Sequence, residues 1–157
     1  MKGDNGHASS SRHDFVPRAY RESGSAEVPD CQSAPWPEHL HRAAARVVAD
    51  FQVAGAVPMS FSCRASDSDI GLATVVVELV GCRYGFGVSL SGSPAEILVA
   101  LADGVQEHWG ECPQTWGEAR PACPGHSHPA EARIERGVAH WTCPADGRLL
   151  APIGELR

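Results

Sequence analysis

Apolar residues recur at intervals of three and four along residues 37–54, which is the period of an amphipathic helix. A second run with this period follows Ser93-Pro94-Ala95-Glu96, where serine, an early proline and a glutamate three residues after the serine form the pattern of a capping box. The pattern therefore predicts two helices, each with one apolar face to bury. The apolar positions are Leu40, Ala44, Val47, Val48 and Phe51 in the first helix, and Ile97, Leu98, Leu101, Val105 and Trp109 in the second.

Between these helices the apolar period shortens to two, as expected for strands with one buried face. Residues 57–63 predict one strand, and residues 72–80 and 84–90 predict two more, joined by a short turn at Gly81-Cys82. The expected fold class is α+β. Its core domain, residues 36–110, is a helix, a three-stranded antiparallel sheet and a helix, and a small β-hairpin module follows over residues 111–157.

The first 35 residues have a different composition. Gly, Ser, Asp, Arg, His and Pro dominate this segment, and sizeable apolar residues are few. Such a segment buries too little apolar surface to offset the conformational entropy lost on folding. Residues 1–35 are therefore predicted to form a disordered N-terminal tail.

Two short turns that each begin with a cysteine are the only segments of the sequence that indicate a specific chemistry, namely metal binding. Cys123-Pro-Gly-His126 and Cys143-Pro-Ala-Asp146 each place a second possible ligand three positions after a cysteine. A structural zinc ion takes about four ligands, commonly as two short pairs of this kind. Proline restricts the backbone of each turn, and Gly147 follows the second turn, where a positive φ angle costs glycine little.

The segment between the two turns alternates on both sides of Glu135-Arg136-Gly137, which predicts a β-hairpin that joins them. Over residues 120–153 the pattern resembles the zinc-ribbon family, whose usual form has a Cys-Pro-x-Cys turn at each end and often an aromatic residue two positions before the second turn. Trp141 occupies that aromatic position. The resemblance implies a small module stabilised by a structural Zn²⁺ ion.

This chain departs from the family at the second ligand of each pair, where histidine and aspartate replace cysteine. The residue types still suit zinc, because imidazole and carboxylate groups bind it alongside thiolates. The expected ligands are Cys123, His126, Cys143 and Asp146, with His128 as the alternative to Asp146. The fourth ligand is open among Asp146, His128, His140 and Cys112.

Composition indicates the kind of organism that encodes the protein and the compartment in which we expect it. The chain has one lysine and one asparagine against many Ala, Gly, Pro and Arg residues, which is typical of a GC-rich bacterial coding sequence. From Trp116 onward, its C-terminal third resembles small proteins of high-GC actinobacteria, and this resemblance implies a compact bacterial cytoplasmic protein without indicating an activity. No apolar stretch is long enough to cross a bilayer, and the N-terminus lacks a secretory signal. A cytoplasmic location predicts that the six cysteines are reduced.

Three functions are compatible with these features. The leading hypothesis is a non-enzymatic module in which structural zinc stabilises a surface for binding another protein. The second is a small hydrolase that uses zinc-bound water with Asp146 or Glu118 as general base, although the chain lacks the metalloprotease and zinc-deaminase motifs. The third is contact with nucleic acid, which a net charge of -6 disfavours. This contact would use Arg120, Arg133, Arg136 and Arg148.

Overall fold

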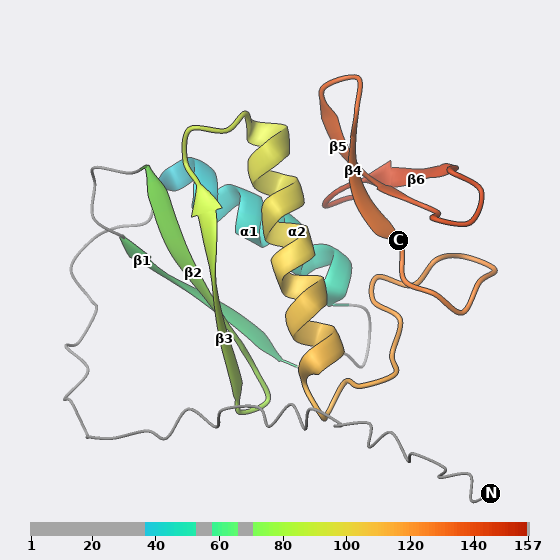
Figure 1. Cartoon of the computed structure of the whole chain (residues 1–157), viewed down its shortest axis with the longest axis horizontal. Coiled ribbons are helices and arrows are strands. Elements are labelled where there is room, and N and C mark those ends of the chain that lie inside the picture. Colours follow the sequence, from blue (N-terminus) through green and yellow to red (C-terminus); the bar gives the residue numbers. More distant parts are fainter. Residues whose placement is uncertain (1–36, 53–57, 66–70, 157) are drawn as a thin grey trace, which may run out of the picture. The chain divides into compact units, whose positions relative to one another are not determined.

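The computed structural model describes residues 37–52, 58–65 and 71–156, which belong to one compact unit of the chain. The predicted disordered tail, residues 1–35, lies outside the described residues. Within them the chain forms two helices and two antiparallel three-stranded sheets (Figure 1). Their order is α1 (Glu38–Phe51), β1 (Met59–Ala65), β2 (Leu72–Leu79), β3 (Cys82–Ser89), α2 (Pro94–Glu111), β4 (Glu131–Glu135), β5 (Val138–Thr142) and β6 (Leu149–Pro152).

The α+β class predicted from the sequence is confirmed, including the order of a helix, three strands and a helix. The first sheet has the strand order β1-β2-β3. Its central strand buries every second residue, as the alternation predicted, and the chain then turns through Val80 and Gly81, both with positive φ. Two residues of this kind suit a tight hairpin because their backbone twist matches that of the paired strands. The described helices are too short or too polar to cross a membrane.

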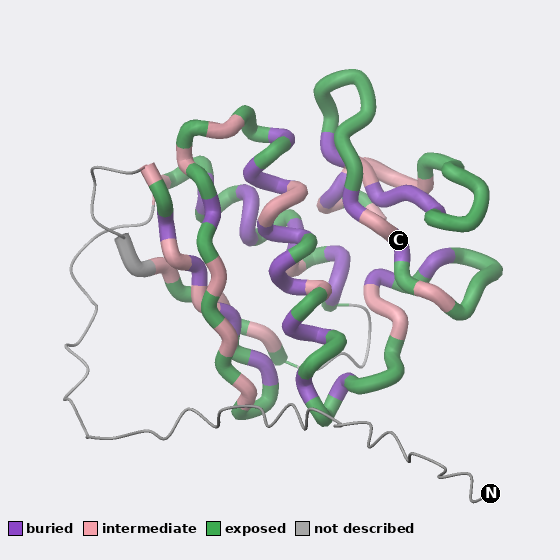
Figure 2. The backbone as a smooth tube through the Cα atoms, viewed as in Figure 1, coloured by how far each residue is buried: buried purple, intermediate pink, exposed green. Residues whose placement is uncertain are grey.

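Helix α2 is the central element of the described fold. Its N-terminus has the predicted capping box: Ser93 Oγ accepts from the Glu96 N–H at 3.3 Å, and Glu96 Oε2 accepts from the Ser93 N–H at 2.6 Å. Buried residues recur along the whole helix, because α2 contacts the first sheet, α1, β4 and β5 (Figure 2). Gly104 lies against the Phe86 ring, where a Cβ atom would collide with the aromatic carbons. The missing side chain is what lets β3 and α2 pack this closely.

The second sheet has the order β4-β5-β6, and its strands contribute to the same buried cluster as the two helices. Trp141 on β5 is fully buried, with its ring centroid 6.0 Å from that of Phe51 on α1. The predicted hairpin of residues 130–142 is present as β4 and β5, with its turn at Arg136 and Gly137. Strand β6 was not predicted from the sequence.

A buried carboxylate connects α1 to the second sheet. Asp50 is 1% exposed and accepts three hydrogen bonds. Its Oδ2 lies 2.6 Å from Trp141 Nε1 and 2.5 Å from the Gly154 nitrogen, and its Oδ1 lies 3.0 Å from the Leu156 nitrogen. Through these three hydrogen bonds Asp50 fixes both β5 and the segment after β6 to the end of α1.

Candidate metal centre

The first cysteine turn lies in a closed loop between α2 and β4. Residues Ala122 and Pro129 form an isolated β-bridge, and the Cys123 N–H donates to the His128 carbonyl at 3.3 Å. Inside this loop the His126 N–H donates to the Cys123 carbonyl at 3.1 Å, and Gly125 has φ of 84°. The proline, glycine and hydrogen bonds together turn the Cys123 and His126 side chains toward the same side.

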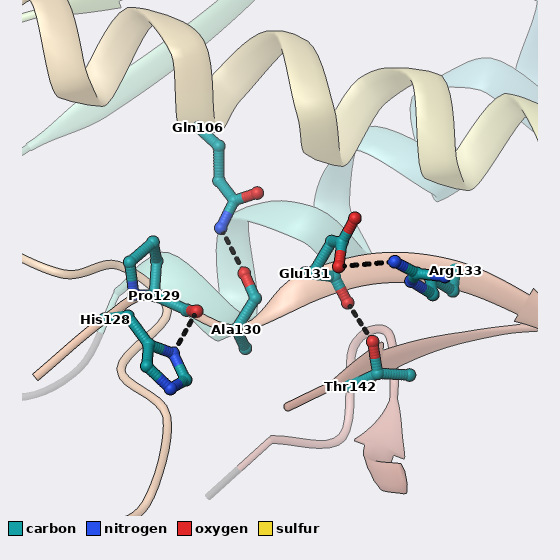
Figure 3. Close-up of polar contacts among 7 residues, drawn as sticks. All are labelled: Gln106, His128, Pro129, Ala130, Glu131, Arg133 and Thr142. Carbon is teal, nitrogen blue, oxygen red and sulfur yellow. Dashed lines mark hydrogen bonds and ion pairs between the residues drawn. The ribbon is translucent and has the colours of Figure 1, made fainter. Parts of the chain in front are cut away.

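A helix side chain holds the base of this loop. Gln106 on α2 donates through Nε2 to the Ala130 carbonyl at 2.6 Å (Figure 3). The same Nε2 donates to the Arg120 carbonyl at 3.0 Å. These two carbonyls lie on either side of the loop, so one amide group fixes both of its ends to the helix. The Thr142 hydroxyl then donates to the Glu131 carbonyl at 3.1 Å, which connects the start of β4 to the end of β5 (Figure 3).

The second cysteine turn follows β5 directly. The Cys143 N–H donates to the Arg148 carbonyl at 2.9 Å, and the Gly147 N–H donates to the Cys143 carbonyl at 2.8 Å. Asp146 Oδ1 accepts from the Arg148 N–H at 2.9 Å. The pKa of Asp146 is lowered mainly by that backbone hydrogen bond, so the group is a carboxylate at neutral pH. Its negative charge is therefore stabilised within its own turn.

The structure brings together four potential ligand atoms from these two turns. The ligand atoms of Cys123, His126, His128 and Cys143 all lie within 4.8 Å of one another. His126 Nδ1 is 3.4 Å from each of the two Sγ atoms. Sulfur and nitrogen ligands at ordinary zinc distances are about 3.6 Å apart along the edge of a tetrahedron, so the spacing of His126 from the two thiols fits a zinc ion. Separations of up to 4.8 Å within the group would shorten when an ion binds.

His128 provides the strongest sign that the group is a ligand set. Its Nδ1 lies 3.0 Å from the Pro129 carbonyl (Figure 3), and because a carbonyl only accepts, the proton of the neutral ring is on Nδ1. The other nitrogen, Nε2, then has a free lone pair, is buried and has no hydrogen-bond partner. Metal-binding histidines are commonly oriented in this way, with one ring nitrogen donating to a carbonyl and the other facing the metal.

The surroundings of the Cys123 thiol disfavour its negatively charged form. Burial raises the pKa of the Cys123 thiol, and the neighbouring Cys143 raises it further. Both residues are buried, whereas His126 is exposed and its ring stacks on that of His128 with centroids 4.8 Å apart. A divalent cation would favour the thiolates, because its charge lowers the pKa of any thiol that coordinates it.

The other residues considered from the sequence lie outside this group. Asp146 accepts from its own turn, and His140 on β5 has its Nδ1 3.1 Å from the Val138 carbonyl. Cys112 ends α2, with its Sγ beside that of Cys82. The structural group therefore contains the alternative ligand His128 in place of Asp146. The signal in the sequence was the spacing His126-Ser-His128, which places two imidazoles on one loop.

Comparisons with protein-family models, with curated proteins and with solved structures found no match for this chain. The resemblances to the zinc-ribbon family and to actinobacterial proteins therefore stay predictions.

Proposed function

We propose that the C-terminal part of the chain, residues 111–157, is a non-catalytic module that binds one structural Zn²⁺ ion through Cys123, His126, His128 and Cys143 and presents a surface to another protein. The observation that carries the zinc proposal is the cluster itself: one ligand atom from each of these four residues lies within 4.8 Å of the others, and the buried Nε2 of His128 has no hydrogen-bond partner. Two thiols and two imidazoles form a donor set that zinc prefers.

The number of donors favours a structural over a catalytic ion. Catalytic zinc sites commonly have three protein ligands and keep one position for water, whereas four protein ligands complete a tetrahedron. The general bases considered for a hydrolase also have other partners. Glu118 lies 3.7 Å from Arg120, and Asp146 accepts from the Arg148 N–H. The hydrolase hypothesis therefore has less support.

Charge pairing likewise gives little support to nucleic-acid binding. Among the four arginines considered for that role, three lie within 4.0 Å of a carboxylate, which offsets their positive charge locally. The pairs are Arg120 with Glu118, Arg133 with Glu131 and Arg148 with Asp146. Phosphate binding needs clustered cations in excess, and this chain has a net charge of -6.

The proposed interaction surface centres on Trp116. This side chain is 81% exposed, although it directly follows Thr115, which is fully buried and hydrogen-bonded to the Trp109 carbonyl. Tryptophan is enriched at the energetic centres of protein interfaces, because its large ring is costly to leave in water. An exposed tryptophan whose neighbour in the chain is buried and hydrogen-bonded is the kind of surface that a partner protein would cover.

Metal analysis of protein purified without a histidine tag tests the zinc proposal. Elemental analysis should give one zinc per chain, and X-ray absorption at the zinc edge should give two sulfur and two nitrogen ligands. A protein that contains no zinc after expression in zinc-supplemented medium, or a zinc ion with bound water, would contradict a closed structural site.

A matched pair of variants identifies the fourth ligand. His128→Ala should weaken zinc binding more than about 100-fold, because loss of a ligand exceeds the roughly 10–100-fold effect of losing an outer hydrogen bond. Asp146→Asn should weaken it by no more than the roughly 10–100-fold expected for an outer hydrogen bond, because Asp146 contacts the Cys143 side chain without joining the ligand group. Competition with a zinc chelator measures both affinities. The reverse order would assign the ligand role to Asp146.

Replacing Trp116 by Ala tests the interaction surface. The variant should retain zinc and thermal stability, because the side chain is exposed, and should lose binding of a partner that purifies with the wild-type chain. A partner that binds both proteins equally would contradict a role for Trp116.

A further inference from the structure

A second pair of cysteines lies outside the candidate metal centre. Cys82 is the first residue of β3, and Cys112 is the residue that caps the C-terminus of α2. Their Sγ atoms are 2.7 Å apart. This separation is shorter than the ordinary contact between non-bonded sulfur atoms, and it exceeds the S–S bond length of about 2.05 Å by only about 0.6 Å.

The groups around this pair distinguish it from a metal site. The side-chain oxygen of Gln114 lies 3.2 Å from Cys82 Sγ and 3.0 Å from Cys112 Sγ, so one amide group is within hydrogen-bond distance of both thiols. Among the described residues, the only group of His, Cys, Asp and Glu with metal-ligand spacing is the one around Cys123 and Cys143. The Cys82 and Cys112 pair therefore has two sulfurs without the imidazole or carboxylate that would complete a metal site.

The backbone holds the two thiols in this position from both sides. Cys82 follows the tight turn of the β2–β3 hairpin and pairs with Leu79. The Cys112 N–H donates to the His108 carbonyl at 3.0 Å, and the ring of His108 stacks on that of Tyr84, with centroids 5.3 Å apart. The start of β3 and the last turn of α2 are thus fixed against each other, so the sulfur atoms need little movement to form a bond.

The two thiols also differ in access to solvent. Cys82 is half-buried, and Cys112 is only 2% exposed. A small oxidant can therefore reach Cys82 first, with Cys112 behind it as the second thiol. The pKa of Cys82 is raised by its hydrogen bond to Cys112 and by desolvation, so the reactive thiolate is scarce at neutral pH and Cys82 reacts with a peroxide slowly.

We propose that Cys82 and Cys112 form a reversible disulfide when the protein meets a hydroperoxide. In the first step, the Cys82 sulfur attacks the terminal peroxide oxygen, the O–O bond breaks, and Cys82 becomes a sulfenic acid while an alcohol or water leaves. In the second step, the Cys112 sulfur attacks the Cys82 sulfur, the S–O bond breaks, and the oxygen leaves as water. The two thiols lose two protons and two electrons, and the peroxide is reduced.

The disulfide would stabilise the part of the fold that it encloses. It would close a loop containing β3 and α2, between residues 30 positions apart. Closing a loop of this length restricts the unfolded chain, and for a domain of this size the expected gain in melting temperature is about 10 °C. This inference goes beyond the proposed zinc function and does not depend on it.

Peptide mapping of the full, zinc-loaded chain tests the proposal. Cleavage after glutamate places the six cysteines on six different peptides, with Cys82 on residues 79–96 and Cys112 on residues 112–118. After treatment with hydrogen peroxide and alkylation of free thiols, the two peptides should be joined, with a mass loss of two hydrogen atoms. Dithiothreitol should restore both thiols and reverse the gain in melting temperature.

Variants of the pair make the test specific. In Cys112→Ser, Cys82 should accumulate sulfenic acid that dimedone traps, because the second thiol is missing. Because Cys82 is only half-buried, the Cys82→Ser variant should fold. It should form no disulfide, and oxidation should not raise its melting temperature. The control Cys63→Ser should respond to peroxide as the wild type does. Peroxide treatment that leaves Cys82 and Cys112 as thiols, or that joins either to another cysteine, would overturn the proposal. A linked Cys123–Cys143 peptide would instead count against the zinc site alone.

Discussion

The two cysteine pairs of this chain have the same sulfur chemistry and different surroundings. Cys123 and Cys143 lie on two turns beside two imidazoles, one of which has a buried nitrogen without a partner. Cys82 and Cys112 lie on a hairpin turn and a helix end beside the amide of Gln114, with their sulfur atoms 2.7 Å apart. The first arrangement supplies four ligand atoms for a cation, and the second supplies two sulfur atoms without further metal ligands.

This difference shows that the groups around a pair of thiols determine whether the pair is suited to binding a metal ion or to forming a disulfide. Imidazole nitrogens complete a soft tetrahedral ligand set, so the first pair is suited to zinc. The neutral amide oxygen of Gln114 is a poor zinc ligand but a good hydrogen-bond acceptor. It therefore orients the Cys82 and Cys112 thiols without adding a metal ligand. The supporting structure also differs, because the first pair depends on loops and the second on the junction of a strand and a helix.

The largest effect is expected for Asp50→Ala. This substitution should weaken the attachment of β5 to α1, and with it the position of Cys143, without affecting the Cys82–Cys112 pair. One buried and two partly buried N–H donors would lose their acceptor, and we expect the free energy of unfolding to fall by about 3–5 kcal/mol. Because the end of β5 leads into Cys143, zinc binding should weaken as well. Urea unfolding and chelator competition measure the two effects.

The matched control on the same helix is Glu38→Ala. Glu38 is exposed and pairs with Arg42 at 3.6 Å, and such surface pairs contribute only about 0–1 kcal/mol. Equal destabilisation by both substitutions would remove the special role of Asp50. Below its unfolding transition, the Asp50 variant should still form the Cys82–Cys112 disulfide.

The next largest effect is expected for Cys143→Ser, which should abolish one site and preserve the other. Zinc affinity should fall more than about 100-fold, since a serine hydroxyl does not replace a thiolate ligand. Hydrogen exchange should become faster in residues 122–129 and 143–148, while β2 and α2 stay protected. The control Cys82→Ser should leave zinc affinity within about 2-fold of wild type. Faster exchange throughout α2 in Cys143→Ser would mean that the metal centre supports the whole core.

The smallest effect is expected for His108→Phe, a substitution close to the Cys82–Cys112 pair that should change how the free energy of unfolding depends on pH. Burial lowers the pKa of His108, so the folded protein binds this proton less readily than the unfolded chain does. Its contribution to stability is therefore present above the ordinary histidine pKa of about 6.5 and is lost as the pH falls through the folded pKa.

Phenylalanine retains a flat ring to stack on Tyr84 but does not titrate. Between pH 7 and pH 5, the free energy of unfolding should fall less steeply in the variant than in the wild type, which urea titrations at several pH values would measure. Comparing the two proteins at each pH cancels the titration of all other groups. Identical pH profiles would exclude His108 as a titrating group in this range.

The features that could be predicted from the sequence are those that depend on neighbouring residues. Helix α1 was expected over residues 37–54 and spans Glu38–Phe51, and the capping box at Ser93 forms as predicted. Both follow from side-chain spacing within one or two turns. Strand β6 was missed because its four residues are too few to show an alternating pattern.

The features that could not be predicted depend on partners far along the chain. Asp50 interrupts no pattern in α1, and nothing nearby indicates that its hydrogen-bond donors are Trp141, Gly154 and Leu156. Cys82 and Cys112 were given no shared role, because only the packing of β3 on α2 brings them together. At the metal centre, the sequence identified both cysteine turns, but the choice between His128 and Asp146 needed the hydrogen bonds that hold each side chain.

The hydrogen bonds of Asp50 also have a consequence for the order of folding during synthesis. The donors of this carboxylate follow it by 91, 104 and 106 residues. When both helices and the first sheet have left the ribosome, none of these donors has emerged, so the Asp50 side chain must stay hydrated until they do. Burial of Asp50 is therefore among the last steps of folding, and a nascent chain that stalls before β6 would expose the apolar surface of α1 to chaperones.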